Sequence, residues 1–164
     1  MSDLANTARA AIIDDAPSIL SIFLESVEQT GVKGEINLLS VVDWIDNAND
    51  QYPLWVLEKD NDIIAWCALE AFYGLPALEG VAEVAIYIAL QHQRQGLGSQ
   101  LLALLEQHAI NHKRHSLVAY VVSDNNNSLQ FFFQNAFKQW GSLPSVVRSG
   151  DIVSDLKLLG RQLD

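Results

Sequence analysis

Residues 83–106, EVAIYIALQHQRQGLGSQLLALLE, decide the fold of this chain. The first half alternates branched apolar residues with other residue types, which predicts a strand over Ala82–Leu90. The second half repeats leucine at helical spacing, which predicts an amphipathic helix with an apolar face of Leu97, Leu101, Leu104 and Leu105. A short turn joins the two halves, so the strand leads directly into the N-terminus of the helix.

The turn is Gln93-Arg94-Gln95-Gly96-Leu97-Gly98. Glycine lets a backbone bend sharply and approach a ligand closely. A helix that begins there directs free N–H groups and the positive end of its dipole into the turn, and Arg94 adds a cation. The turn therefore predicts a site for a phosphate or pyrophosphate. The alternative is an ordinary glycine turn without a ligand.

Known phosphate-binding patterns narrow this interpretation. The chain lacks the P-loop run G-x-x-x-x-G-K-[ST], and of the dinucleotide-binding pattern G-x-G-x-x-G only Gly96 and Gly98 are present. Gln93, Gly96 and Gly98 match a third pattern, Q/R-x-x-G-x-G/A. In this stretch the sequence resembles the GNAT family of acyl-CoA-dependent N-acetyltransferases. The resemblance implies that residues 93–98 bind the pyrophosphate of acetyl-CoA and that the preceding strand lines the acyl-pantetheine arm.

A second motif extends the resemblance toward the C-terminus. Residues 124–137 resemble the family pattern D-N-x-x-S-x-x-L-[HY]-x-x-x-G-F, with Asn125, Ser128 and Phe137 in matching places and Ala136 where the family has glycine. Residues 82–88 resemble the E-x-S-V-Y-V segment of the phosphinothricin acetyltransferase-like branch. Pro144, Val146 and Asp155 fit part of the C-terminal pattern of that branch.

Length and composition predict a single globular domain that comprises residues 1–164. Hydrophobic residues make up 49% of the chain, yet no apolar run is long enough to span a membrane. The first residues, MSDLANTARA, lack the apolar core of a signal peptide. The one cysteine, Cys67, lies in an apolar run, where we expect a buried thiol. We therefore expect a cytoplasmic protein that does not bind membranes.

The formal net charge of −10 argues against nucleic acid as a partner, because a nucleic-acid-binding protein needs a basic face. The one basic run, residues 112–115, falls where the helix after the glycine turn should end, and cations are favourable there. No group of Cys and His residues has the spacing of metal ligands, so we expect no metal.

Periodicity and turn residues divide the rest of the chain into alternating strands and helices. The predicted strands are 8–13, 53–58, 63–69, 82–90, 116–122 and 155–159. The predicted helices carry apolar stripes at 19–27, 40–48, 97–106 and 128–135, and Ser40–Asp43 matches a capping box. The order predicts an α/β fold of the α+β type with helices on both faces of a mixed sheet. The family resemblance implies a mostly antiparallel sheet of the GNAT type.

Acetyl transfer to an amine needs a base for the ammonium proton and hydrogen-bond donors for the thioester oxygen. The resemblance implies that Glu83 is the base, with Tyr87 on the same side of the strand. It also assigns the backbone of Ile86, Tyr87 and Ile88 to the acyl-pantetheine arm. Asn125 is expected to contact that arm or to cap a helix, and Ser128 to line the site or serve only as an N-cap.

Phe132 stands where the family often has a tyrosine or histidine, so this ring cannot protonate the leaving thiolate and that proton must come from water or Tyr87. We expect Phe72, Glu79 and Glu83 to contact the acceptor. The branch has an arginine at the place of Glu79 and a lysine at the place of Ser149, so acceptors with a free carboxylate should be disfavoured. Only Arg148 could compensate.

The expected function is therefore that of an acetyl-CoA-dependent N-acetyltransferase for a small-molecule amine. A homodimer is compatible with this expectation. Two alternatives stay open at this point. One is a non-catalytic acyl-CoA-binding module, suggested by Phe132, and the other is a protein N-terminal acetyltransferase.

Overall fold

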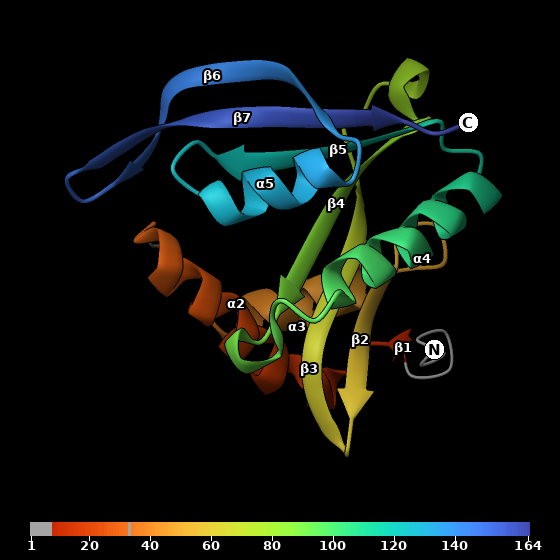
Figure 1. Ribbon diagram of the computed structural model, residues 1–164. Helices are drawn as coiled ribbons and strands as arrows, with labels where there is room; N and C mark the ends of the chain where they lie inside the picture. Colours follow the sequence, from red (N-terminus) through yellow and green to blue (C-terminus); the bar gives the residue numbers. More distant parts are fainter. Residues whose placement is uncertain (1–7, 33) are drawn as a thin grey trace.

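In the computed structural model, which describes residues 8–32 and 34–164, the chain forms a seven-stranded sheet with the order β1-β2-β3-β4-β5-β7-β6 (Figure 1). Every neighbouring pair is antiparallel except β4–β5, which is parallel. The strands are β1 (Ala8–Ala10), β2 (Leu54–Lys59), β3 (Asp62–Ala71), β4 (Val81–Ile88), β5 (Ser116–Val122), β6 (Lys138–Ser149) and β7 (Ile152–Gln162). The α-helices are α2 (Ala16–Thr30), α3 (Leu38–Asn47), α4 (Leu97–Asn111) and α5 (Asn126–Gln134).

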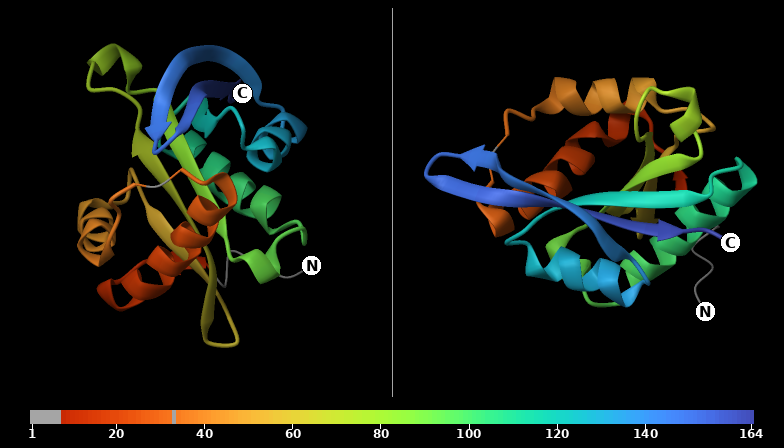
Figure 2. Two further views of the ribbon diagram at one scale, coloured as in Figure 1. Left: turned by 90° about the vertical axis from the view of Figure 1, so that its left-hand side faces the viewer. Right: turned by 90° about the horizontal axis from the view of Figure 1, so that it is seen from above.

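The helices cover both faces of the sheet, as predicted, and Figure 2 shows the strands between the two helix pairs. On one face, α4 and α5 bury Leu101, Leu105 and Phe132 against β2–β5. On the other face, α2 and α3 bury Ile19 and Val41. Cys67 on β3 is fully buried in the first of these cores, which confirms the expected core thiol. Burial raises its pKa to about 12.

The central strands and their connections follow the sequence prediction closely. A two-residue turn joins β2 to β3, with Asp60 and Asn61 at φ values of 52° and 66°, the left-handed geometry that suits a tight hairpin. Strand β5 has the predicted bounds, and α4 ends just before the basic run 112–115. Strand β4 ends two residues earlier than predicted, because Leu90–His92 forms a short 3₁₀ turn, η3.

Strands β4 and β5 separate along their length. The parallel pairing covers only Val81–Glu83 against Ser116–Val118. Beyond Glu83 the two strands run apart, so that in Figure 1 β4 descends toward the glycine turn while β5 continues along β7. The divergence leaves one backbone edge of β4 open in the middle of the sheet.

The end of the first strand and the starts of two helices differ from the sequence prediction. The first strand ends at Ala10, and Ile13–Asp15 forms a 3₁₀ turn, η1, instead of extending the strand. Helix α3 begins at Leu38, so the predicted capping box at Ser40 is wrong. Its N-cap is Asn37, whose side chain accepts from the Ser40 N–H at 3.1 Å while the Ser40 hydroxyl accepts from the Asn37 N–H.

The N-terminus of α5 is also capped by a different residue from Ser128. Asn125 is the N-cap, and its Oδ1 accepts from the Ser128 N–H at 3.2 Å. Ser128 is therefore the third residue of the helix rather than its cap.

The C-terminal region is a long β-hairpin, where the sequence predicted an irregular stretch followed by one short strand. Strands β6 and β7 pair from Lys138↔Gly160 to Ser149↔Ile152, with register shifts on both sides of Gly141–Leu143. The second shift, between Leu143 and Val147, spans Pro144. Because β6 is an edge strand, an irregularity can accommodate a proline that lacks a donor.

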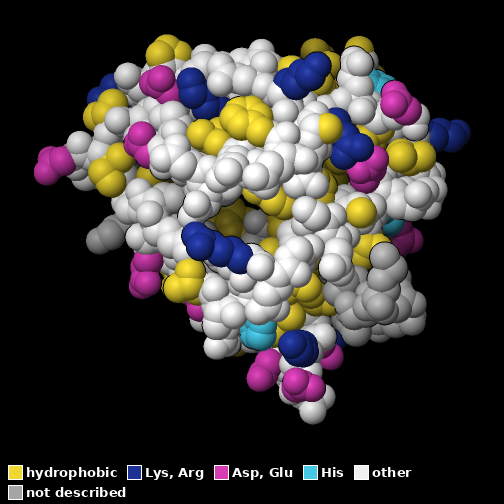
Figure 3. All heavy atoms as spheres, in the orientation of Figure 1, with side chains coloured by type: hydrophobic (Ala, Val, Ile, Leu, Met, Phe, Trp, Pro, Cys, Tyr) yellow, Lys and Arg dark blue, Asp and Glu magenta, His cyan; other side chains and the backbone are white. Residues whose placement is uncertain are grey.

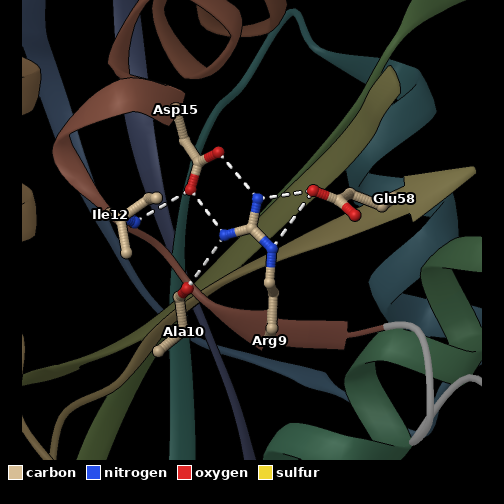
Figure 4. A network of polar contacts seen from close by, with 5 residues as sticks. All are labelled: Arg9, Ala10, Ile12, Asp15 and Glu58. Atoms are coloured by element: carbon tan, nitrogen blue, oxygen red, sulfur yellow. Dashed lines mark hydrogen bonds and ion pairs between the residues drawn. The ribbon is translucent and has the colours of Figure 1, made fainter. Parts of the chain in front are cut away.

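The short strand β1 is held by a polar network around Arg9 (Figure 4). Two guanidinium nitrogens each donate to a different carboxylate oxygen of Asp15 at 2.8 Å, and the same guanidinium donates to Glu58 on β2. Asp15 also accepts from the Ile12 N–H. The Arg9 hydrogen bonds, with that of Ile12, hold the pKa of Asp15 below its usual value although the carboxylate is buried. The network connects β1, η1 and β2.

Within the described ranges, no helix is long and apolar enough to cross a membrane.

Candidate active site

The glycine turn has the geometry of an anion cradle. Gly96 has a φ of 78°, and Arg94, two residues earlier, has a φ of 62°. Gly96 is also the N-cap of α4. In the part of the chain that the structure describes, the N–H groups of Leu97, Gly98 and Ser99 have no backbone partner, as expected for the first turn of a helix. These donors and the dipole of α4 favour a phosphate group in the turn.

Side chains fix the turn to the rest of the fold. The Gln93 amide donates to the Ile88 carbonyl at 3.0 Å, so it folds back onto β4. Glu25 on α2 accepts from the Leu90 N–H at 2.7 Å. A side chain on Gly98 would meet the Phe131 ring at 2.9 Å, so the start of α4 packs directly against α5.

The open edge of β4 carries the backbone of Ile86 and Ile88. The Ala89 N–H donates to the Ile64 carbonyl, which makes that pair a hydrogen-bonded pair of the antiparallel ladder. Because such pairs alternate, Tyr87 directs its N–H and C=O toward β3, whereas Ile86 and Ile88 direct theirs toward the gap beside β5. The free edge is suited to the amide groups of a pantetheine arm.

A cavity of about 460 Å³ extends from the turn along this edge and under α5. In Figure 3 the surface is hollowed below α5, with hydrophobic side chains inside and a basic side chain at the rim. All predicted cofactor-binding residues except Tyr87 and Gln95 line it, namely Ile86, Ile88, Gln93, Arg94, Gly96, Leu97, Gly98, Asn125 and Ser128. The residues present fit acetyl-CoA, although each individual contact stays a prediction.

A second cavity, of about 440 Å³, lies on the opposite side of β4. Three cross-strand pairs of β3 and β4 form its floor: Trp66↔Tyr87, Ala68↔Ala85 and Glu70↔Glu83. The Trp66 and Tyr87 rings stack with centroids 4.5 Å apart. The alanine pair in the middle has small side chains and therefore leaves space above the strands. The carboxylates lie at the end where β4 leaves β5.

Aromatic side chains from α2, α3 and the following loop line one side of this second cavity. Phe23 packs against Trp44 and Tyr87 with ring centroids 5.6 and 5.4 Å apart. Tyr52 lines the same cavity, and the Arg114 guanidinium lies over the Tyr52 ring at 4.8 Å. The two helices between the first two strands thus form one wall of this second cavity, which we name the acceptor cavity for the role proposed for it.

Glu83 is a half-buried carboxylate that lines the acceptor cavity. Its burial, and next the charge of Glu70, raise the pKa of Glu83 to about 7. Burial, with the charges of Glu70 and Glu83, also raises the pKa of Tyr87, so this phenol stays protonated at neutral pH. Glu83 and Tyr87 therefore share one face of β4, as predicted, in an apolar setting that favours a neutral acid.

Two residues predicted to contact the acceptor lie outside the cavity. The Glu79 side chain is exposed, and the Glu79 carbonyl accepts from Arg114 at 2.7 Å. Phe72 stacks on Tyr120 of β5 with centroids 6.5 Å apart. No contact with the cavity supports their assignment to the acceptor site.

Sequence reasoning missed Glu70 and Tyr120. Glu70 faces Glu83 across the strand pair, and the Glu83 charge, after burial, raises the pKa of Tyr120. Only the β3–β4 register could have revealed Glu70 in advance. Over residues 8–32 and 34–164, no group of three or more His, Cys, Asp or Glu side chains could hold a metal ion.

Comparison with known proteins agrees with this geometry. A model described as "Acetyltransferase (GNAT) family" matches residues 19–137. The chain belongs to the GNAT family. It is accordingly an acyltransferase enzyme that uses acetyl-CoA as co-substrate, which argues against the binding-module alternative.

Individual relatives confirm the likeness to the phosphinothricin acetyltransferase branch. The chain is 32% identical to the Bacillus subtilis protein "Putative phosphinothricin acetyltransferase YwnH", over 96% of this chain and 99% of the relative. It is 25% identical to an "L-methionine sulfoximine/L-methionine sulfone acetyltransferase" of Pseudomonas aeruginosa, over 98% of this chain and 96% of the relative. A crystal structure of a "putative phosphinothricin N-acetyltransferase" has a TM-score of 0.87 at 31% identity, and the match covers 96% of this chain and 98% of that chain.

Proposed function

We propose that this GNAT enzyme acetylates the amine of a small molecule by direct attack, with Glu83 as the base. The supporting observation is the position of Glu83. It lies at the last residue of β4 that pairs with β5, on the face of the acceptor cavity, with a pKa raised to about 7. A base with a pKa near the working pH combines a useful deprotonated fraction with a strong tendency to accept a proton.

The proton of the ammonium group passes to the Glu83 carboxylate, directly or through one water molecule. The amine can then form the new C–N bond. Acetyl-CoA supplies the acetyl group as an activated thioester. The N–H groups of Ile86 and Ile88, which face the gap beside β5, are the donors available to the thioester oxygen.

The departing thiolate needs little help, because a thiol has a pKa of about 8.5. Phe132 is buried against Phe131 and Phe137 and has no proton to donate. Tyr87 and Tyr120 are protonated phenols near Glu83, and with water they are the proton sources on this side of the sheet.

The names of the relatives suggest amino-acid-like acceptors, since two of them are named for phosphinothricin or for methionine sulfoximine and sulfone. The acceptor of this chain is a small molecule by the same reasoning. The cavity beside Glu83 has a volume of about 440 Å³ and is lined by Phe23, Trp44 and Tyr52, a size and lining that suit a small-molecule amine.

Thiol release from acetyl-CoA in the presence of an amine panel tests the proposal. The wild-type enzyme should acetylate at least one small amine, and Glu83→Gln should lower its turnover by roughly 10²–10⁴-fold. Acetyl-CoA affinity should stay unchanged in the variant, because Glu83 does not line the cofactor cavity. A fully active Glu83→Gln enzyme would show that the base is elsewhere. Acetylation of peptide N-termini alone would favour the protein N-terminal acetyltransferase alternative.

A further inference from the structure

The geometry of the acceptor cavity points to a particular acceptor: a protonated primary amine with an apolar, ring-sized body and no carboxylate. This inference rests on the proposed function and specifies its substrate. It departs from the amino-acid-like compounds for which the relatives are named. Three features of the cavity support it, namely its floor, its walls and its charge.

The floor separates a charged end from an apolar end. Glu70 and Glu83 are directly opposite each other on β3 and β4, and directly opposite residues have Cβ atoms about 4.5–5.5 Å apart. Two residues further along each strand are Ala68 and Ala85, and two further again are the stacked rings of Trp66 and Tyr87. An acceptor that lies along the floor therefore has its amine at one end and its body over the alanines.

The walls are mostly apolar over the same length, with Asn47 and Asn49 as their polar members. Phe23 and Trp44 pack edge-on against each other above the Tyr87 end, and Tyr52 and Leu54 also line the cavity. The rings offer an apolar surface for a flat or branched body.

The charge of the cavity is negative. Among the described residues that line it, Glu70 and Glu83 are ionisable carboxylates and there is no Lys, Arg or His. Neither carboxylate has a hydrogen bond or an ion pair with another described residue. A bound ammonium group would give both of them a partner. It would also relieve the repulsion that raises the pKa of Glu83.

The same charge disfavours a carboxylate on the acceptor. The nearby cations are already engaged elsewhere or lie outside. Arg114 sits over the Tyr52 ring and donates to Gln51 and Glu79, and it does not line the cavity. The exposed Arg148 donates to the Ser145 carbonyl on β6 and does not line it either. An α-carboxylate beside Glu70 and Glu83 would face like charges, which is costly in a partly desolvated site.

Matched acceptors test the inference. Phenethylamine, phenylalanine methyl ester and phenylalanine share one ring and differ in the carboxylate, whereas the diamine putrescine lacks the apolar ring. We expect kcat/KM to be at least tenfold higher for phenethylamine and for the ester than for phenylalanine. Both compounds should also be better acceptors than putrescine.

Variants of Glu70 test whether this carboxylate causes the preference for acceptors that lack a carboxylate. Glu70→Arg should reverse or abolish the preference for the ester over phenylalanine, chiefly through KM. Glu70 is exposed at the strand end, so the fold should tolerate the change. Asp62→Arg makes the same charge change on an exposed residue at the other end of β3 and should leave the preference intact. Quenching of Trp fluorescence by phenethylamine reports binding without turnover, because Trp44 and Trp66 line the cavity.

The outcomes distinguish this inference from the proposed function. Acetylation that favours phenylalanine or methionine sulfone over the ester would overturn this inference and leave the proposed function standing. A preference for putrescine would overturn the assignment of an apolar body. Absence of transfer to every amine, with acetyl-CoA bound, would overturn the proposed function itself. An unchanged preference in Glu70→Arg would also contradict the inference.

Discussion

Ala136 occupies a backbone conformation that favours glycine. Helix α5 ends in a Schellman motif, in which the Phe137 N–H donates to the Phe132 carbonyl and the Ala136 N–H donates to the Phe133 carbonyl. The motif places Ala136 at a φ of 66°. The Phe132 and Phe137 rings, 4.9 Å apart, complete it and hold the residue there.

Ala136→Gly should therefore stabilise the protein. The left-handed conformation costs an L-residue roughly 1–2 kcal/mol, and glycine loses about 0.4–1 kcal/mol through the greater freedom of its unfolded chain. We expect a net increase in the free energy of unfolding of about 0.5–1 kcal/mol, measured in urea. The same substitution at Ala103, inside α4, should lower it by about 1 kcal/mol. A destabilised Ala136→Gly protein would contradict the strain argument.

At the residue scale, the sequence predicted where the residues of β4 lie better than the shape of the acceptor cavity. Glu83, Tyr87 and the glycine turn lie within one contiguous stretch, so its pattern and its family resemblance were sufficient to select them as candidates. Glu70 comes from the neighbouring strand and meets Glu83 only through the β3–β4 register. Glu79, which is close to Glu83 in sequence, points into solvent because the chain turns before β4 begins.

At the scale of single elements, the glycine turn is the most specific test of the cofactor site. Gly96 has a φ of 78°, but a Cβ atom there would meet no atom closer than 3.9 Å. Glycine is therefore favoured at position 96 by the left-handed backbone conformation and not by a lack of space for a side chain. Valine strongly disfavours that conformation because it is β-branched.

Gly96→Val should remove acetyl-CoA binding and leave the fold largely intact. The reoriented N–H groups at the start of α4 would no longer converge on a phosphate. Isothermal titration with acetyl-CoA measures the effect, and circular dichroism checks the fold. Gly74→Val is the matched control, because no atom lies within 4 Å of a Cβ built there. Unchanged affinity in Gly96→Val would disprove the pyrophosphate assignment.

The Arg9 network should be important for the first strand. Strand β1 has three residues, and its guanidinium bridges two carboxylates whose side chains are 7% and 40% exposed. Arg9→Gln should lower the free energy of unfolding by about 1–3 kcal/mol at pH 7, the range for losing hydrogen bonds to charged groups. Arg148→Gln, at an exposed site, should change it by less than about 0.5 kcal/mol.

The pH dependence follows from the lowered pKa of Asp15. A carboxylate whose pKa is lower in the folded state stabilises the fold above its unfolded pKa of about 4, and that contribution disappears as the pH falls through the folded pKa. The difference between wild type and Arg9→Gln should therefore shrink in urea unfolding near pH 3. A difference independent of pH would show that the ion pair is not its source.

Physical features of the chain explain why some elements were not predicted from the sequence. The β6–β7 hairpin carries Pro144 and two register shifts, so its period-2 pattern is interrupted where a strand would be recognised. The capping box at Asn37 precedes the apolar stripe by a turn, so the sequence pattern alone favours the later Ser40–Asp43 motif. Long, regular elements such as α4 and β5 were predicted well because their periodicity is uninterrupted.

For the whole molecule, the sheet connects both cores. The cluster under α4 and α5 and the cluster under α2 and α3 share strands β2, β3 and β4. The chain should therefore unfold in a single cooperative transition, as the single-domain prediction requires. Calorimetry with two separate transitions would contradict the prediction of one domain.

Acetyl-CoA at a hundredfold excess over its dissociation constant should stabilise the fold by about 2.7 kcal/mol.

The central claim is that Glu83 is the base between the cofactor cavity and the acceptor cavity. Its pKa is raised to about 7 by burial and by Glu70, so the carboxylate gains its basic form as the pH rises through that value. The tyrosines around it, Tyr87 and Tyr120, stay protonated in this range. Removing the charge of Glu70 should lower the pKa of Glu83.

The most direct test is the pH profile of kcat/KM for acetyl transfer between pH 5 and 9. The wild-type enzyme should show a rising limb centred near pH 7, where the base deprotonates. Glu70→Gln should move the limb to lower pH, and Glu83→Gln should lose both the limb and most of the rate. A limb at the same pH in Glu83→Gln, with the rate retained, would contradict the assignment of Glu83 as the base.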